Sequence, residues 1–290
     1  MEYIFLLIVI FLVYIQNILT KQYNNKNKEE SAGIIFLLIK VLAATVFLGI
    51  VFIFNPMFSW TTFYFAMGFA CSFSICIYAS FMAIKTGPLS LSTLISSFAI
   101  LLPSLYSVIF LGETFTEWSI IGLILLCISF VLINKIEKDK KFNFRWLFFV
   151  LLSFLGNGIN SILQKVHQET LKMQGLNAND YAVAFQFFAM VAVSILFMIA
   201  FLIQKSKATR DGLKQCLLYA PLTGVANAVC NVLMLVLATM LSGVVLYPSV
   251  SAGGIVFTFI TALILYKERY TKWQYVGYAC GIFSVILLSI

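Results

Sequence analysis

Long apolar runs, separated by short polar breaks, divide the chain along its whole length. No Asp, Glu, Lys or Arg occurs between Val41 and Ile84, or between Gln215 and Tyr266. Each stretch is too long for one membrane helix, which needs about 20 residues, and long enough for two. The pattern predicts ten transmembrane helices, at residues 3–20, 32–54, 60–84, 89–111, 117–134, 145–165, 181–204, 214–239, 243–266 and 272–290. Because a helix satisfies its own backbone hydrogen bonds in lipid, the predicted fold class is an all-α integral membrane protein.

Composition supports a multi-pass protein of the plasma (inner) membrane. Hydrophobic residues make up 62% of the chain and charged residues only 10%, whereas soluble domains carry roughly 25% charged residues. The net charge of +8 comes from Lys and Arg between the apolar runs, so the expected partner is the lipid bilayer and not nucleic acid. The six cysteines fit neither a zinc site nor a disulfide framework by their spacing. No metal and no cofactor are predicted.

The two halves of the chain repeat one another. A shift of 155 residues places five residues on identical ones: Glu113, Thr116, Trp118, Gly122 and Ser129 fall on Glu268, Thr271, Trp273, Gly277 and Ser284. A shift of 144 residues aligns 15–21 with 159–165. Each half holds five predicted helices, and an odd number inverts the second copy. We therefore predict two inverted five-helix repeats, 1–134 and 145–290, joined by a linker at 135–144. Inverted repeats are frequent in secondary transporters, whose cargo site lies near mid-membrane.

Positive charges alternate from loop to loop. Nearly all Lys and Arg residues fall in or beside the first, third, fifth, seventh and ninth loops. The other four loops hold only Lys165 and Lys172 by this assignment. The positive-inside rule then places the odd loops in the cytoplasm and both termini outside.

Each half ends with a short turn that contains a glutamate, followed by a last helix that contains a glycine. The residues concerned are Pro103, Gly112, Glu113 and Gly122 in the first half and Glu268 and Gly277 in the second. With the five-helix repeat they resemble the drug/metabolite transporter superfamily, EamA-like branch, over nearly the whole chain. The resemblance implies an exporter or exchanger that moves small organic metabolites by alternating access. It also implies cytoplasmic termini, opposite to the loop charges, so the orientation stays open.

The sequence departs from the usual pattern of the superfamily at several positions. Lys267 stands where the family turn usually has glycine, and Thr258 stands opposite Pro103. Small multidrug resistance relatives exchange protons through a glutamate in the first helix. This chain has Gln16 and Asn17 there and no acidic residue inside any predicted helix. A carboxylate-based proton antiport is therefore disfavoured.

A polar stripe in the eighth predicted helix is the sharpest candidate for the cargo site. Thr223, Asn227 and Asn231 are spaced four residues apart, so they share one helix face. Amides are costly to leave unpaired in lipid and must face protein or a water-filled cavity. The 155-residue shift places Gly68, Ser72 and Cys76 opposite them. We predict that the two stripes line a pocket for a small-molecule substrate; in the alternative, the amides only bond neighbouring helices.

Further candidates lie in the first, second and sixth predicted helices. Lys40 is the only charge well inside a predicted helix, where it could bind an anionic group of the cargo or snorkel to the interface. The first and sixth helices carry equivalent amides, namely Gln16 and Asn17 against Asn157 and Asn160. Gly156 and Gly158 flank Asn157, as a gating kink or as a site of close packing.

Two glutamates and a glycine motif are expected to stabilise the fold and not to bind the cargo. Glu113 and Glu268 are expected to cap helix starts at the membrane edge. Gly277 and Gly281 form a GxxxG motif, which indicates a packing face or a homodimer through the last helix.

No enzyme class fits the residues. The single histidine, His167, is assigned to a loop, and no nucleophile–base pair or metal-ligand set falls inside a helix, so no catalytic residue is predicted. The alternatives to a transporter are a channel or a non-transporting membrane sensor. A channel would be expected to show charge rings or a filter-like loop, and neither occurs in the sequence.

Overall fold

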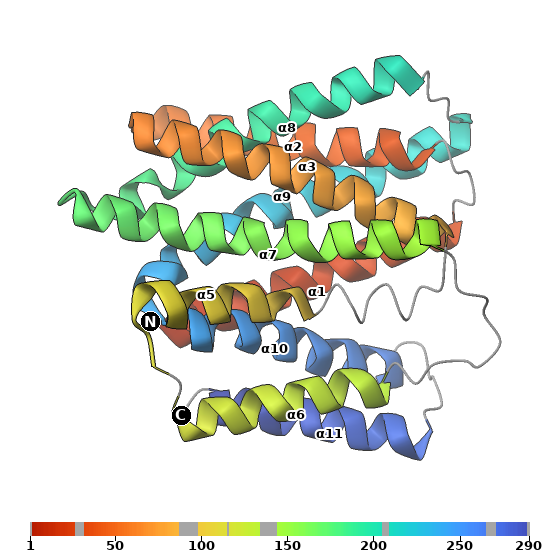
Figure 1. Ribbon diagram of the computed structural model, residues 1–290. Helices are drawn as coiled ribbons and strands as arrows, with labels where there is room; N and C mark the ends of the chain where they lie inside the picture. The colour runs from red at the N-terminus through yellow and green to blue at the C-terminus, as the bar shows by residue number, and fades with distance from the viewer. Residues whose placement is uncertain are drawn as a thin grey trace. The chain divides into compact units, whose positions relative to one another are not determined.

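The computed structural model describes residues 2–26, 32–86, 98–114, 116–133, 144–204, 209–264 and 271–288, and within them all regular structure is helical (Figure 1). The α-helices are α1 (Glu2–Lys26), α2 (Ala32–Phe54), α3 (Trp60–Thr86), α5 (Leu101–Leu111), α6 (Glu117–Ile133), α7 (Phe144–Met173), α8 (Ala182–Gln204), α9 (Arg210–Met240), α10 (Gly243–Ile264) and α11 (Lys272–Leu288). Two 3₁₀ turns, η1 (Phe98–Ile100) and η2 (Ala178–Tyr181), precede α5 and α8. These ten α-helices confirm the all-α prediction. Residues 89–97 of the fourth predicted helix lie outside the described residues.

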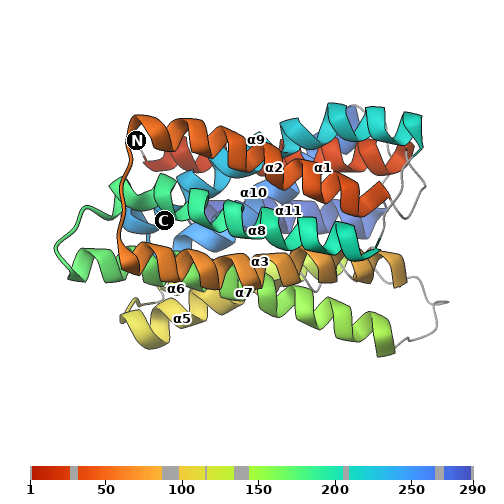
Figure 2. The same ribbon diagram turned by 90° about the horizontal axis from the view of Figure 1, so that it is seen from above.

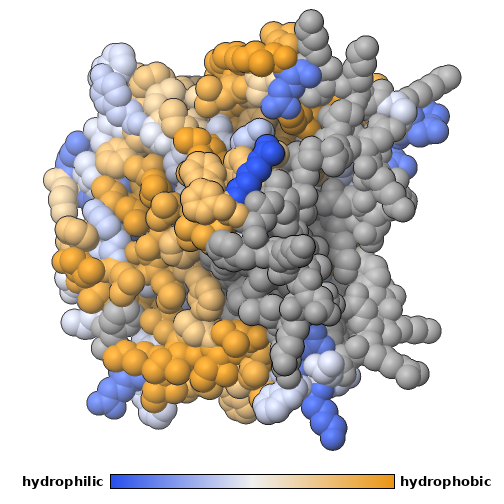
Figure 3. All heavy atoms as spheres, turned by 45° about the vertical axis from the view of Figure 1, so that its right-hand side comes forward, coloured by the Kyte–Doolittle hydropathy of each residue, from blue (hydrophilic) through white to orange (hydrophobic). Residues whose placement is uncertain are grey.

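Within the described ranges, length and composition identify six helices that can cross a bilayer. They are α1, α2, α3, α7, α8 and α9, while α5 and α6 are shorter apolar helices. Apolar side chains cover a broad part of the described surface in Figure 3, as expected for residues that face lipid. Val46, Ile53 and Phe54 on α2, for example, are largely exposed.

The sixth predicted helix, 145–165, is too short: α7 continues to Met173. The polar residues after 165 are good helix formers, so polarity alone does not end the helix. The end comes at Gly175, whose φ of +73° suits glycine. Leu176 N–H bonds the Leu171 carbonyl at 3.0 Å and Gly175 N–H bonds the Lys172 carbonyl at 2.9 Å, a Schellman motif. Lys165, His167 and Lys172 are therefore helical and not in a loop.

The chain forms two compact units, and each takes segments from both halves of the sequence. Unit 1 comprises residues 1–10, 75–165 and 240–290, and unit 2 comprises 11–74 and 166–239. Helices α1, α3 and α7 each pass from one unit to the other. The predicted division at 135–144 concerns the sequence repeat and stays a prediction.

In unit 1, α11 packs along α6, and α10 packs against α5 and α11 (Figure 1). Ser284 Oγ on α11 donates to the Gly122 carbonyl on α6 at 2.8 Å. Gly277 and Gly281 are buried on α11, so the structure favours the packing interpretation of the GxxxG motif.

In unit 2, α2 packs along α8 (Figure 2). Thr45 and Ser194 join these two helices through their hydroxyl groups at 2.9 Å. Gly49 faces the Phe187 ring, which a Cβ would approach to 3.2 Å, and Phe52 stacks on the same ring. The interior of this unit includes Phe69, Phe185 and Met190, all fully buried.

Candidate substrate-binding site

The predicted amides of α1 and α9 meet inside unit 2. Asn227 Nδ2 donates a hydrogen bond to Gln16 Oε1 at 3.0 Å. Gln16 is buried and its Nε2 donates to the Leu12 carbonyl at 3.3 Å. We call Gln16 and Asn227 the amide pair. The amide pair joins α1 to α9, which agrees with the alternative that the amides bond neighbouring helices. The role of the pair in cargo binding stays a prediction.

The rest of the α9 stripe bonds within its own helix. Asn231 Nδ2 donates to the Asn227 carbonyl at 2.9 Å, and Thr223 Oγ1 donates to the Tyr219 carbonyl at 2.7 Å. Thr223 is fully buried, whereas Asn227 and Asn231 are half-buried.

Lys40 lies beside this stripe because α2 approaches α9 closely at Gly224. A Cβ on Gly224 would lie 2.1 Å from the Lys40 carbonyl oxygen. Gly224 stands next to Thr223 of the stripe and three residues before Asn227, whose side chain bonds Gln16. Unit 2 thus brings together Lys40, Gln16 and Asn227 from three helices.

The remaining predicted residues are distributed differently. Ser72 is half-buried on α3 in unit 2. Cys76, one turn later, is buried in unit 1, where its thiol donates to the Ser153 carbonyl at 3.5 Å. Asn160 is buried on α7, whereas Asn157 is exposed. The side chain of Asn17 lies outside the described residues.

Gly158 is a site of close helix packing. A Cβ there would lie 2.3 Å from Leu102 Cδ1 on α5. Because α7 is one α-helix from Phe144 to Met173, the structure favours packing over a helix break at this glycine.

The longer α7 carries a buried polar stripe that the sequence analysis missed. Asn160, Gln164, His167 and Gln168 are all buried, at spacings of four, three and one residues that put them on one helix face. His167 Nε2 lies 3.0 Å from Thr62 Oγ1 on α3. The spacing was readable in the sequence, but ending the helix at residue 165 divided the stripe between a helix and a loop.

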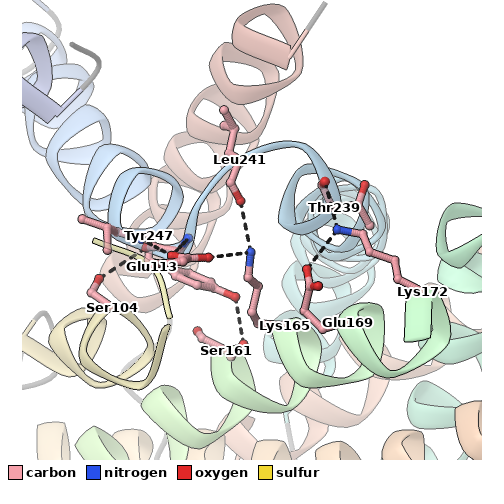
Figure 4. A network of polar contacts seen from close by, with 11 residues as sticks. Ser104, Glu113, Ser161, Lys165, Glu169, Lys172, Thr239, Leu241 and Tyr247 are labelled. Carbon is pink, nitrogen blue, oxygen red and sulfur yellow. Dashed lines mark hydrogen bonds and ion pairs between the residues drawn. The ribbon is translucent and has the colours of Figure 1, made fainter. Parts of the chain in front are cut away.

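A buried ion pair in unit 1 corrects the expectation that Lys40 is the only charge inside a helix. Lys165 on α7 is 5% exposed and its Nζ lies 3.1 Å from Glu113 Oε1, in the α5–α6 turn (Figure 4). Lys165 Nζ also donates to the Leu241 carbonyl at 3.2 Å. Glu113 Oε2 accepts the Gly243 N–H at 2.7 Å. Glu113 therefore caps a helix start as expected, but the helix is α10 and not its own α6.

Two further contacts hold these elements of unit 1 together. Tyr247 OH donates to the Ser161 carbonyl at 2.9 Å, and Ser104 Oγ donates to the Gly243 carbonyl at 3.4 Å (Figure 4). Gly243 itself faces Ser107, whose Oγ a Cβ would approach to 2.1 Å. The start of α10 is thus fixed on α5, on α7 and on the Glu113 carboxylate.

A second, more exposed ion pair lies further along α7, in unit 2. Lys172 Nζ bonds Glu169 Oε1 at 2.9 Å and donates to the Thr239 carbonyl at 3.2 Å (Figure 4). Glu169 also corrects the statement that no acidic residue occurs inside a helix. Among the described residues, no group of three or more His, Cys, Asp or Glu is arranged to hold a metal ion.

Comparison with known proteins assigns the chain to a family. The sugar transport protein family matches residues 7–290. No match was found among curated proteins. Twenty-eight chains of solved structures match. One of them, described only as the crystal structure of a protein, has a TM-score of 0.70 at 12% identity, over 100% of this chain and 98% of that one, and shows the same fold.

The family match covers nearly the whole sequence and agrees with the apolar helical fold. The family is one of membrane transporters and not of enzymes, and it lies in the drug/metabolite transporter superfamily that the turn residues resemble. The chain belongs to the sugar transport protein family.

Proposed function

We propose that the chain is a secondary transporter of sugars in the plasma membrane, working by alternating access between two inverted five-helix repeats. The name of the family supports a sugar as the cargo. The observation that carries the proposed site is the amide pair, in which Asn227 Nδ2 bonds Gln16 Oε1 inside a membrane helix bundle.

The chemistry of the amide pair suits sugar hydroxyls. A glutamine or asparagine amide both donates and accepts hydrogen bonds, as a hydroxyl group does. The bond between Gln16 and Asn227 can therefore be exchanged for bonds to a sugar at little net cost. Asn231 supplies a further donor beside the pair, and the backbone of Lys40 lies against α9 at Gly224.

Three observations support the repeat. Thr116 Oγ1 accepts the Ser119 N–H at 3.1 Å at the start of α6, and Thr271 Oγ1 accepts the Gln274 N–H at 3.4 Å at the equivalent start of α11. These two equivalent helices pack against one another. The 155-residue shift also carries residues 32–74 of unit 2 onto 187–229, within its other segment, 166–239. This pattern is expected where two copies of one EamA-like repeat intertwine.

The test is counterflow in proteoliposomes that contain the purified protein and a panel of labelled neutral monosaccharides. We expect saturable counterflow for a defined set of sugars. Asn227→Ala should lower it by about tenfold, since it removes one hydrogen-bonding partner of the cargo. Asn177→Ala, at an exposed loop asparagine, is the matched control and should transport as wild type does. No counterflow across the panel would overturn the function, and wild-type rates in Asn227→Ala would overturn the site.

A further inference from the structure

Unit 2 contains a second group of buried polar side chains, on α7 and α8. His167, Gln168 and Gln186 are each 0% exposed. No described residue bonds His167 Nδ1, or either amide atom of Gln168 or Gln186. Buried polar groups are almost always hydrogen-bonded, and leaving them unpaired costs stability. Five such atoms on three residues therefore indicate that something else bonds them.

The three residues lie at or next to one contact between α7 and α8 in unit 2. The rings of His167 on α7 and Phe185 on α8 are 4.6 Å apart, centroid to centroid. Gln168 and Gln186 are the next residues along their respective helices, so each lies within one residue of this direct α7–α8 contact. The Phe65 ring on α3 also lies near His167, 5.8 Å from the imidazole, centroid to centroid. We call His167, Gln168 and Gln186 the glutamine cluster.

The unpaired atoms define the chemistry of the ligand. Each amide offers a donor nitrogen and an acceptor oxygen, and the imidazole Nδ1 takes either role according to its tautomer. A phosphate or a carboxylate only accepts, and an ammonium only donates, so neither satisfies the cluster. Hydroxyl oxygens do both. The charged residues of this part of α7 are already paired, Lys165 with Glu113 and Lys172 with Glu169.

We infer that the glutamine cluster binds the hydroxyl groups of a neutral sugar, with the Phe65 and Phe185 rings beside it for the apolar face of the sugar ring. This site uses α7, α8 and α3, whereas the amide pair uses α1 and α9. The inference rests on the proposed function, because the cluster is closed to solvent in this structure and a ligand enters through the opening that transport requires. A buried water molecule could donate and accept the same hydrogen bonds as a sugar hydroxyl. The binding experiment below distinguishes the sugar from water.

The repeat provides an independent argument for a binding role of this face. Under the 144-residue shift, Gln16, Thr20 and Tyr23 of α1 correspond to Asn160, Gln164 and His167 of α7. Gln16 and Tyr23 are also buried, but Tyr23 is bonded by Cys216 at 3.3 Å and Gln16 by Asn227. The α1 copy of the stripe is thus satisfied within the protein, and the α7 copy keeps free hydrogen-bonding atoms at His167 and Gln168.

The experiment is equilibrium binding of labelled glucose, ribose and rhamnose to the full chain in lipid nanodiscs, with gluconate and glucosamine as charged comparators. The variants are Gln168→Met and Gln186→Met, on separate helices; methionine keeps the length and shape of glutamine and removes both amide atoms. Gln204→Met, at an exposed glutamine of α8, is the matched control. The unfolding temperature without sugar verifies folding, and we expect it not to fall, since the variants remove unpaired groups.

We expect a neutral sugar to bind wild type and the control at two classes of site, the charged comparators to bind more weakly, and each cluster variant to weaken binding at one of the two classes by at least about tenfold. Wild-type affinity at both classes of site in both cluster variants would show that the amides hold water only and would overturn the inference, while counterflow by the wild type would leave the transport function standing. Conversely, binding lost in the variants without any counterflow by the wild type would uphold the cluster and overturn the transport function. If no sugar in the panel binds, the inference is wrong.

Discussion

At the scale of the residue, Glu113 is a largely buried polar side chain satisfied by partners that are distant in sequence. Glu113 has three such contacts: the Lys165 ammonium and the N–H groups of Gly243 and Val244. Removing one partner of a buried ion pair leaves an uncompensated charge, which usually costs more than the pair contributes. The pair therefore fixes α7, the α5–α6 turn and the start of α10 in one arrangement.

We predict a large coupling between Glu113 and Lys165 in a double-mutant cycle. Lys165→Met should lower the free energy of unfolding by about 3 kcal/mol, because the carboxylate loses its counter-charge. The double variant with Glu113→Gln should recover part of that loss. The free energies are measured by SDS titration in mixed micelles.

The matched control is the exposed pair, Glu169→Gln with Lys172→Met. Its side chains are 26% and 39% exposed, so its coupling should stay below about 1 kcal/mol. Equal coupling energies in the two cycles would contradict the prediction for Glu113 and Lys165.

Sequence reasoning identified several polar residues but not their partners. Gln16 and Asn227 are both predicted, because isolated amides in apolar helices are conspicuous. Their mutual bond is not predictable from spacing, since they lie 211 residues apart. The polar residues after 165 predict a helix end too early, and so a loop position for Lys165 and His167, because only the later Gly175 stops the helix.

At the scale of the element, glycines set how closely the helices of unit 2 approach. Gly224 lets α9 contact the backbone of α2 at Lys40. A backbone carbonyl cannot turn away as a flexible side chain can, so any larger residue must separate the two helices.

We therefore predict that Gly224→Ala destabilises the protein by about 1–3 kcal/mol, the usual cost of overpacking, and lowers sugar counterflow because Lys40 moves away from the α9 stripe. Gly68→Ala, at an exposed position of α3, is the control for unfolding and should be neutral or stabilising because alanine favours a helix. Thermal unfolding checks both variants, and counterflow checks Gly224→Ala. Wild-type values for Gly224→Ala would contradict the close approach.

The helices themselves are largely predictable from the sequence. Runs of apolar residues that stop at Asn55-Pro56 and at Gly112 predict the last residues of α2 and α5 correctly, at 54 and 111. Which helices pack against one another is not predictable from the sequence. Nearly every face of a membrane helix is apolar, so hydrophobicity alone cannot distinguish a face that contacts another helix from one that contacts lipid.

At the scale of the whole molecule, the corrected helix bounds sharpen the charge asymmetry. Lys165 and Lys172 now belong to α7, so the connections 55–59, 112–116, 174–181 and 241–242 contain no Lys or Arg at all. All other Lys and Arg residues except Lys40 lie in or beside the opposite set of loops. This arrangement favours cytoplasmic odd loops.

We predict the orientation accordingly. In a variant without the six native cysteines, Asn177→Cys should react with an impermeant maleimide added to intact cells. Asp211→Cys should react only after the cells are permeabilised. Gel-shift labelling of both variants checks this expectation. The reverse pattern would place the termini in the cytoplasm, as the resemblance to the superfamily implies.

The contact of α6 with α11 has a consequence for biosynthesis. The two helices lie about 150 residues apart in the sequence, so α6 is synthesised long before its partner exists. At 5–20 residues per second, that interval is about 8–30 s. During this time the small-residue face of α6, with Gly122 and Ser129, has no α11 to cover it. A nascent chain at this stage is open to wrong pairing or to binding by insertion chaperones, and slower translation of the second half would lengthen that exposure.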